Sequence, residues 1–169
     1  MPGKKAPYNT GRKTVSKLEH PDINLCALLD QATDIINRAT ELEIEPHRVT
    51  LAQARVLFLL ARAKGSRGVT LTDLSKWMLR EPNSVSVLIS RMEKAGLLKK
   101  MRDAAENRIF VSITPKGREM VMDRLTEKSM VLIMSALTEG EKQNLRKYLK
   151  KLRVKGRGVL GIDLKPPFV

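Results

Sequence analysis

The chain has 169 residues, enough for one domain with flexible arms, and 42% of them are hydrophobic while 30% are charged. Its formal net charge of +14 favours a polyanionic partner, which DNA, RNA or an acidic membrane face could provide. The longest apolar run, Val56–Ala61, is far shorter than the ~20 residues that a membrane span needs. A single cysteine excludes an intramolecular disulfide and agrees with a reducing compartment. From these two observations we expect a cytoplasmic protein that does not cross a membrane.

The first part of the chain predicts a flexible arm followed by two helices. Residues 1–20 are polar and basic, contain proline and glycine, and lack the apolar stretch of a secretion signal. From Pro21 apolar residues recur at steps of three and four, which predicts a helix that ends near Pro46. Thr50 and Gln53 then have the spacing of a capping box and open a second helix.

Two shorter helices are expected in the middle of the chain. An extended piece, Val69–Leu71, precedes a helix for which Thr72 is the predicted N-terminal cap. The next helix begins after only a few residues, because Pro82 suits a first helical turn and Gly96 suits a C-terminal stop. Two helices are therefore joined by a short turn.

The C-terminal part predicts a hairpin and two further helices. The segments Leu97–Lys100 and Ile109–Ile113 favour β-structure on either side of a polar turn. A long methionine-rich helix is expected over Pro115–Ala136, and a capping box opens a last helix over Thr138–Val154. The tail, residues 155–169, contains glycine and proline and is expected to be irregular.

The short turn between two helices, the second of them amphipathic, predicts a helix-turn-helix whose second helix fits the major groove of B-DNA. With Val85, Leu88, Ile89 and Met92 turned inward, the outer face combines hydroxyls, an amide and two cations. Such groups can bind base edges and phosphates. The candidate DNA-binding residues on this helix are Asn83, Ser84, Ser86, Val87, Ser90, Arg91 and Lys94.

The predicted hairpin adds positive charge where a wing would contact DNA. Residues 76–118 contain ten Lys or Arg and four Asp or Glu. An arginine at the rim of a hairpin can enter a narrow minor groove, and Arg108 is the candidate for this contact. The candidate DNA-binding residues of the hairpin are Lys99, Lys100, Arg102 and Arg108.

Four segments resemble, in order and spacing, the signature blocks of the MarR family of bacterial transcriptional regulators. They are Thr50–Leu60, Leu71–Leu79, Ser84–Leu98 and Ile113–Arg118. The resemblance implies a mainly α fold with a small β-hairpin: a winged helix-turn-helix with N- and C-terminal dimerisation helices. On that basis the reading unit spans about residues 50–114, and the dimerisation helices span about residues 21–45 and 115–154.

The resemblance also implies a function. Members of the family bind a pseudo-palindromic operator as homodimers, usually repress transcription, and release the DNA when a small anionic or phenolic effector or an oxidant acts on them. The partners implied here are double-stranded DNA, a second copy of the chain and such an effector. At the wing tip the family tends to have an Asp followed by two basic residues. This chain departs from that pattern, since it has Glu106-Asn107-Arg108.

Two other functional classes remain open: a winged-helix protein-interaction module and a non-specific architectural nucleic-acid-binding protein. No paired acid and base indicates an enzyme, no motif indicates a cofactor, and the spacing of His20 and His47 predicts no metal site. Apolar neighbours predict an inert thiol for Cys26. The methionines of the long helix either fill a dimer core or line a ligand cleft.

Overall fold

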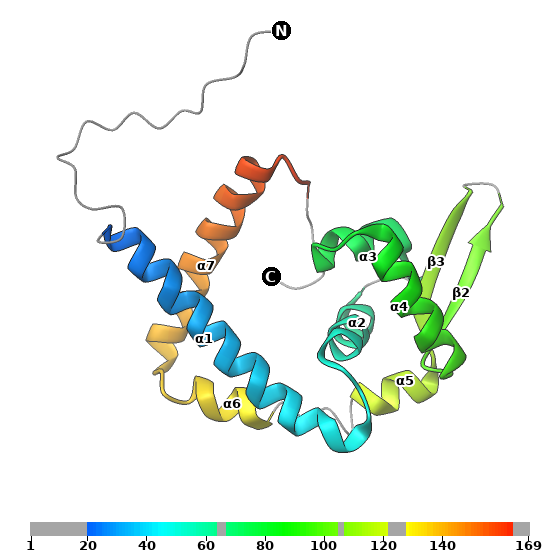
Figure 1. The fold of residues 1–169 in the computed structure, drawn as a ribbon, viewed down its shortest axis with the longest axis horizontal. Coiled ribbons are helices and arrows are strands. Elements are labelled where there is room, and N and C mark those ends of the chain that lie inside the picture. Colours follow the sequence, from blue (N-terminus) through cyan, green and yellow to red (C-terminus); the bar gives the residue numbers. More distant parts are fainter. Residues whose placement is uncertain (1–19, 64–66, 105–106, 122–127, 164–169) are drawn as a thin grey trace, which may run out of the picture.

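The computed structural model describes residues 20–63, 67–104, 107–121 and 128–163 (Figure 1). Its elements confirm the mainly α fold with a small antiparallel sheet. In chain order they are α1 (Pro21–Ile44), the 3-10 turn η2 (Glu45–His47), α2 (Leu51–Arg62), β1 (Val69–Thr70), α3 (Leu71–Met78), α4 (Pro82–Lys94), β2 (Leu98–Asp103), β3 (Arg108–Ile113), α5 (Pro115–Glu119), α6 (Lys128–Met134) and α7 (Glu139–Leu160).

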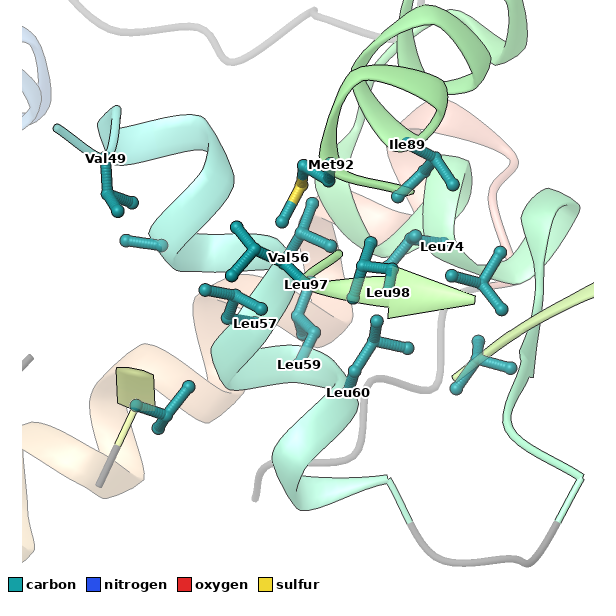
Figure 2. Close-up of a cluster of buried hydrophobic side chains, with 14 of the residues drawn as sticks. Val49, Val56, Leu57, Leu59, Leu60, Leu74, Ile89, Met92, Leu97 and Leu98 are labelled. Carbon is teal, nitrogen blue, oxygen red and sulfur yellow. The ribbon is translucent and has the colours of Figure 1, made fainter. Parts of the chain in front are cut away.

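The core lies among α2, α3, α4 and the sheet. Figure 2 shows Leu57 of α2, Leu74 of α3 and Ile89 of α4 among the aliphatic side chains that converge there, and all three are fully buried. Burying one such side chain stabilises the fold by about 1.5–3 kcal/mol. The core therefore fixes the two helices of the helix-turn-helix against α2 and the hairpin.

The sheet is larger than the predicted hairpin. Its strand order is β1-β3-β2, and both pairings are antiparallel. The piece expected only to be extended pairs with β3 through Val69 opposite Val111. The second strand also continues to Asp103, which lies opposite Arg108. The charged residues Arg102 and Asp103 make this extension resemble a turn in the sequence, yet charged side chains are common on edge strands.

Local caps explain where most helices begin. The capping boxes at Thr50 and Thr138 are both present, as predicted. The expected cap of α3 at Thr72 is wrong by two residues, because the Thr70 hydroxyl accepts the Asp73 N–H at 3.1 Å. Thr70 has the extended backbone that a cap requires, whereas Thr72 lies inside the helix.

Two expectations for the C-terminal part need correction. The last helix does not stop near Val154 but continues to Leu160, so residues 155–160 of the predicted irregular tail are helical. Gly156 and Gly158 weaken this last part of the helix only modestly, and Gly161, which has a left-handed backbone, ends the helix. The helix expected over 115–136 is described only as α5 and α6, because residues 122–127 lie outside the described residues, as do residues 1–19 of the expected arm.

The carboxylate of Glu43 joins the end of α1 to the start of α6. Its two oxygens accept the N–H groups of Lys128 and Ser129 at 2.9 and 3.0 Å. These N–H groups would have no partner within α6, so Glu43 caps that helix from a position 85 residues earlier in the chain. In the described part of the chain, no helix is both long and apolar enough to cross a bilayer.

Candidate nucleic-acid interface

A tight turn, residues 79–81, positions α4 relative to α3. The N–H groups of Leu79 and Arg80 donate to the carbonyls of Lys76 and Ser75, both at 3.1 Å, and these bonds close α3. Leu79 has a left-handed backbone with φ of 51°. This conformation costs a residue with a side chain roughly 1–2 kcal/mol, which the packing of the two helices has to offset.

One face of α4 is buried and the other is open. Val85, Ile89 and Met92 are fully buried in the core, so the sequence-predicted inner face is confirmed. The exposed residues at steps of three and four form a single stripe along the helix, which we call the outer stripe. It consists of Asn83, Ser84, Val87, Arg91 and Lys94.

The other two candidates on α4 are half-buried serines with internal partners. The Ser90 hydroxyl donates to the carbonyl of Ser86 at 2.9 Å and accepts a hydrogen bond from Lys100 Nζ at 3.1 Å. Both serines therefore lie beside the outer stripe, on the side of α4 that faces the hairpin.

Lys100 connects the hairpin to α4. Its ammonium lies 2.9 Å from Glu93 Oε2, and its backbone N–H donates to Glu93 Oε1 at 3.0 Å. The hydrogen bond from the Lys100 ammonium lowers the pKa of Glu93 below its ordinary value. A charge that the sequence assigned to DNA contact is thus already compensated within the protein.

Lys99 lies on the opposite side of the strand. Successive side chains of a strand point to opposite faces, so Lys99 and Lys100 diverge. Lys99 lines a hollow of about 280 Å³ together with Ser112 of β3 and Arg118 of α5. The structure therefore does not bring the two neighbouring lysines together on the side of α4.

The wing tip is held by polar contacts between its two strands. Arg102 donates to the side-chain carbonyl of Asn107 at 3.1 Å, and Asn107 has the left-handed backbone of the turn, with φ of 48°. Arg108 is exposed and lies directly opposite Asp103 in the ladder. Glu106 lies outside the described residues.

The C-terminal end of α4 is fixed by the segment after the hairpin. Gly96 has φ of 74°, and the Leu97 N–H returns to the Met92 carbonyl at 3.0 Å, which ends the helix as predicted. Lys116 Nζ then donates to the Ala95 carbonyl at 2.9 Å, and the Thr114 hydroxyl donates to the Gly96 carbonyl at 2.7 Å. Two side chains from beyond the wing thus bind the carbonyl end of the recognition helix.

Gly117 allows α5 to approach this helix end closely. A Cβ atom at Gly117 would lie 2.2 Å from the Leu97 carbonyl oxygen and 2.9 Å from Ile113 Cγ1. In the sequence the run Ile113–Arg118 carries only a family resemblance, and nothing in it indicates this contact. Arg80, an exposed cation in the turn immediately before α4, was not among the predicted site residues either.

Metal binding and thiol chemistry depend on the His, Cys, Asp and Glu side chains. Within the described residues no group of three His, Cys, Asp or Glu side chains could hold a metal ion. Cys26 is a free thiol that is exposed on α1, although its neighbours in the sequence suggested apolar surroundings. The neighbours Leu25, Ala27 and Leu28 are exposed as well, because this part of α1 is uncovered in the single chain.

A recognition helix with an open outer stripe, a helix packed behind it and an adjacent hairpin define a winged helix-turn-helix protein. The model of the MarR family matches residues 48–109, which run from the turn before α2 into β3. The resemblance found in the sequence is thus confirmed: this segment matches the MarR family, and the chain has the fold of that family's regulators.

Solved structures of MarR-family regulators share this fold at low sequence identity. S. aureus MepR in complex with DNA is 22% identical, with a TM-score of 0.67 over 77% of this chain and 96% of that chain. A mutant MarR from E. coli complexed with operator DNA is 20% identical, with a TM-score of 0.68 over 81% of this chain and 99% of that chain. The organohalide-sensing regulator RdhR in its 2,4-dichlorophenol-bound form is 24% identical, with a TM-score of 0.68 over 88% and 89%. No curated protein matches the sequence.

Replacing Gly117 by alanine should destabilise the protein by about 1–3 kcal/mol, because the new methyl group overlaps a backbone carbonyl that cannot move freely. Urea unfolding monitored by circular dichroism measures the change. Gly158→Ala is the matched control, since a Cβ there meets no atom within 4 Å and alanine favours a helix interior. Equal effects of the two substitutions would contradict the close approach.

Replacing Lys100 by methionine should reduce stability at neutral pH by less than ~1 kcal/mol, because the Glu93–Lys100 pair is partly exposed. The lowered pKa of Glu93 means that the pair stabilises the fold above the unfolded carboxyl value of 4.5. This contribution is lost as pH falls through the lowered folded pKa of Glu93, so the difference between wild type and Lys100→Met should shrink as the pH falls below 4.5. Lys99→Met removes the same charge and should show no such pH dependence.

Proposed function

We propose that the protein is a sequence-specific DNA-binding transcriptional regulator that represses transcription by binding a pseudo-palindromic operator as a homodimer. The observation that carries this proposal is the outer stripe of α4, which is open and polar and ends in two cations while the opposite face is buried. The two DNA complexes among its structural neighbours support the same function. Such a regulator acts on the chromosome, in the cytoplasm of a bacterium.

The outer stripe would lie in the major groove. At the N-terminal end of α4, Asn83 and Ser84 offer short polar side chains, and unpaired backbone N–H groups there suit a phosphate. Arg91 and Lys94 reach further along the groove. The wing would place Arg108 at the minor groove and Arg102 at the adjoining phosphates. The contacts of Ser90 and Lys100 assign them to positioning the hairpin, Ser86 lies one turn before Ser90 on the same side of α4, and Lys99 faces away from α4.

Arg91→Ala or Arg108→Ala should weaken specific operator binding by about 1–3 kcal/mol without changing the oligomeric state. Operator DNA is first selected from a random duplex library, and affinity is then measured by gel shift at fixed salt. Arg118→Ala is the matched control, because it removes the same charge from the far side of the sheet. Unchanged binding by both test variants would contradict the assigned surface.

Competition with random duplex separates the alternatives. A regulator prefers its selected operator by about 10³-fold or more, whereas an architectural protein binds both duplexes alike. Failure to bind any nucleic acid would favour a protein-interaction module.

The helices outside the reading unit leave apolar side chains uncovered. Helices α6 and α7 bury no residue in the single chain, and α1 buries only Ile44. Contiguous apolar stripes of this kind mark interaction surfaces. The exposed apolar residues are Ile23, Leu25, Leu28, Ile35 and Leu42 on α1, Val131 and Leu132 on α6, and Tyr148, Leu149, Leu152, Val154, Val159 and Leu160 on α7.

Charge complementarity indicates which surfaces would meet. Helix α1 has five acidic residues and only one basic residue, Arg38, whereas α7 has eight basic residues and two acidic ones. On α7 the cations flank the apolar stripe on both sides. A second copy would therefore place the acidic α1 of one protomer against the basic α7 of its partner. This arrangement supports the two-fold dimer that a pseudo-palindrome requires.

Leu152→Glu should shift the protein from dimer to monomer, because it places a carboxylate in the apolar stripe of α7. Sedimentation equilibrium measures the change. The matched control is Leu79→Glu, since Leu79 is 62% exposed against 54% for Leu152 but lies in the turn before α4. A dimer that persists in Leu152→Glu would contradict this interface, and wild-type protein that sediments as a monomer would contradict the dimer itself.

A hollow of about 340 Å³ between α2, β1, α3 and β3 is the candidate effector site. Trp77 and Phe110 provide aromatic walls, and Arg62 at its rim could bind a carboxylate or phenolate. Because the hollow borders α3, a bound effector would act on the helix that supports α4. The structure of RdhR with 2,4-dichlorophenol shows that a protein of this fold can bind a phenol.

Benzoate or phenol should change the fluorescence of Trp77, the single tryptophan of the chain, in a saturable way. Arg62→Met keeps the aliphatic part of the side chain and removes the guanidinium, so it should weaken benzoate binding more than phenol binding. The same ligands should weaken operator binding. Fluorescence that does not respond to either compound would contradict the assigned site.

A further inference from the structure

Val87 is the one apolar residue among the polar and charged residues of the outer stripe. Its side chain is 53% exposed, and it is the one large apolar side chain of α4 that is exposed. The neighbouring Leu88 packs against the core, but Val87 does not. Nothing in the folding of the described chain requires an isopropyl group at this position.

The position of Val87 within the stripe indicates what it would face. Ser84 lies one turn before it and Arg91 one turn after it, so polar side chains flank it along the groove. On its hairpin side, the Ser90 hydroxyl is already bonded to the Ser86 carbonyl and to Lys100. The centre of a recognition helix lies nearest the base edges, while phosphates line the walls of the groove.

An isopropyl group cannot form a hydrogen bond with a base edge. Four groups line the major-groove edges of the bases: acceptors, donors, hydrogens and the 5-methyl group of thymine. Only the thymine methyl offers an apolar surface that gains from contact with another apolar group. Val87 thus matches one base by its chemistry.

We propose that Val87 is a specificity-determining residue that contacts the 5-methyl group of a thymine in each half-site of the operator. This inference rests on the proposed function, and it deepens it by naming one base that the outer stripe selects. Val87 supplies the apolar contact, whereas Arg91 and the N-terminal residues of α4 supply the polar ones.

The experiment uses the selected operator and the full chain. Each thymine of one half-site is replaced in turn by deoxyuridine, which keeps the base pair and removes only the methyl group. At one position the replacement should weaken wild-type binding about fourfold, the factor that corresponds to burying one methyl-sized group at ~0.8 kcal/mol. Val87→Ala should bind the thymine and uracil operators equally. Thr72→Ala is the matched control, because it truncates an exposed β-branched side chain on α3, outside the outer stripe, and should retain the preference.

The outcomes separate the two proposals. A selected consensus in which every thymine tolerates uracil would overturn the role of Val87 alone, as would a uracil effect that persists in Val87→Ala. A selection that yields no consensus would overturn operator binding, and the role of Val87 with it. Thermal unfolding of Val87→Ala should match wild type, since the side chain supports no packing.

Discussion

The close approach between α5 and the carbonyl end of α4 is the constraint on which the proposed DNA-binding surface depends. Gly117 lies against the Leu97 carbonyl, and Lys116 and Thr114 bind the carbonyls of Ala95 and Gly96. The recognition helix α4, the wing and helix α5 therefore contact one another through residues 95–97 and 114–117. Because Lys116 brings a positive charge to a helix C-terminus, the contact is also electrostatically favourable.

The fold was largely predictable because its signals are local. Thr50 and Thr138 cap helices with residues three positions away, and Gly96 ends α4 through its own backbone. Signals that depend on distant partners were missed. The cap of α6 comes from Glu43, and β1 became a strand only because β3 lies beside it. In the candidate site, periodicity identified the exposed residues of the outer stripe but also placed Ser86 and Ser90 on the open face, where the hairpin half-buries them. The direction of each hairpin lysine depended on the pairing of the strands, which the sequence did not reveal.

The distribution of charge gives the chain two distinct surfaces. The outer stripe and the wing form one basic surface, and α7 forms another. Net charge alone suggested a single polyanionic partner. In the proposed dimer the acidic α1 of a second copy would lie against α7, so that the overall charge of +14 need not be matched entirely by nucleic acid.

The carboxylate bridge from Glu43 to α6 has a mechanical consequence. Since it ties the first N–H groups of α6 to the end of α1, these two helix ends cannot separate without breaking both hydrogen bonds. Ile44, the single buried residue of α1, packs into the core at the same end of the helix. In the proposed dimer, a tilt of α1 and α6 would therefore reach the core of the reading unit through this one end and would change the distance between the two recognition helices.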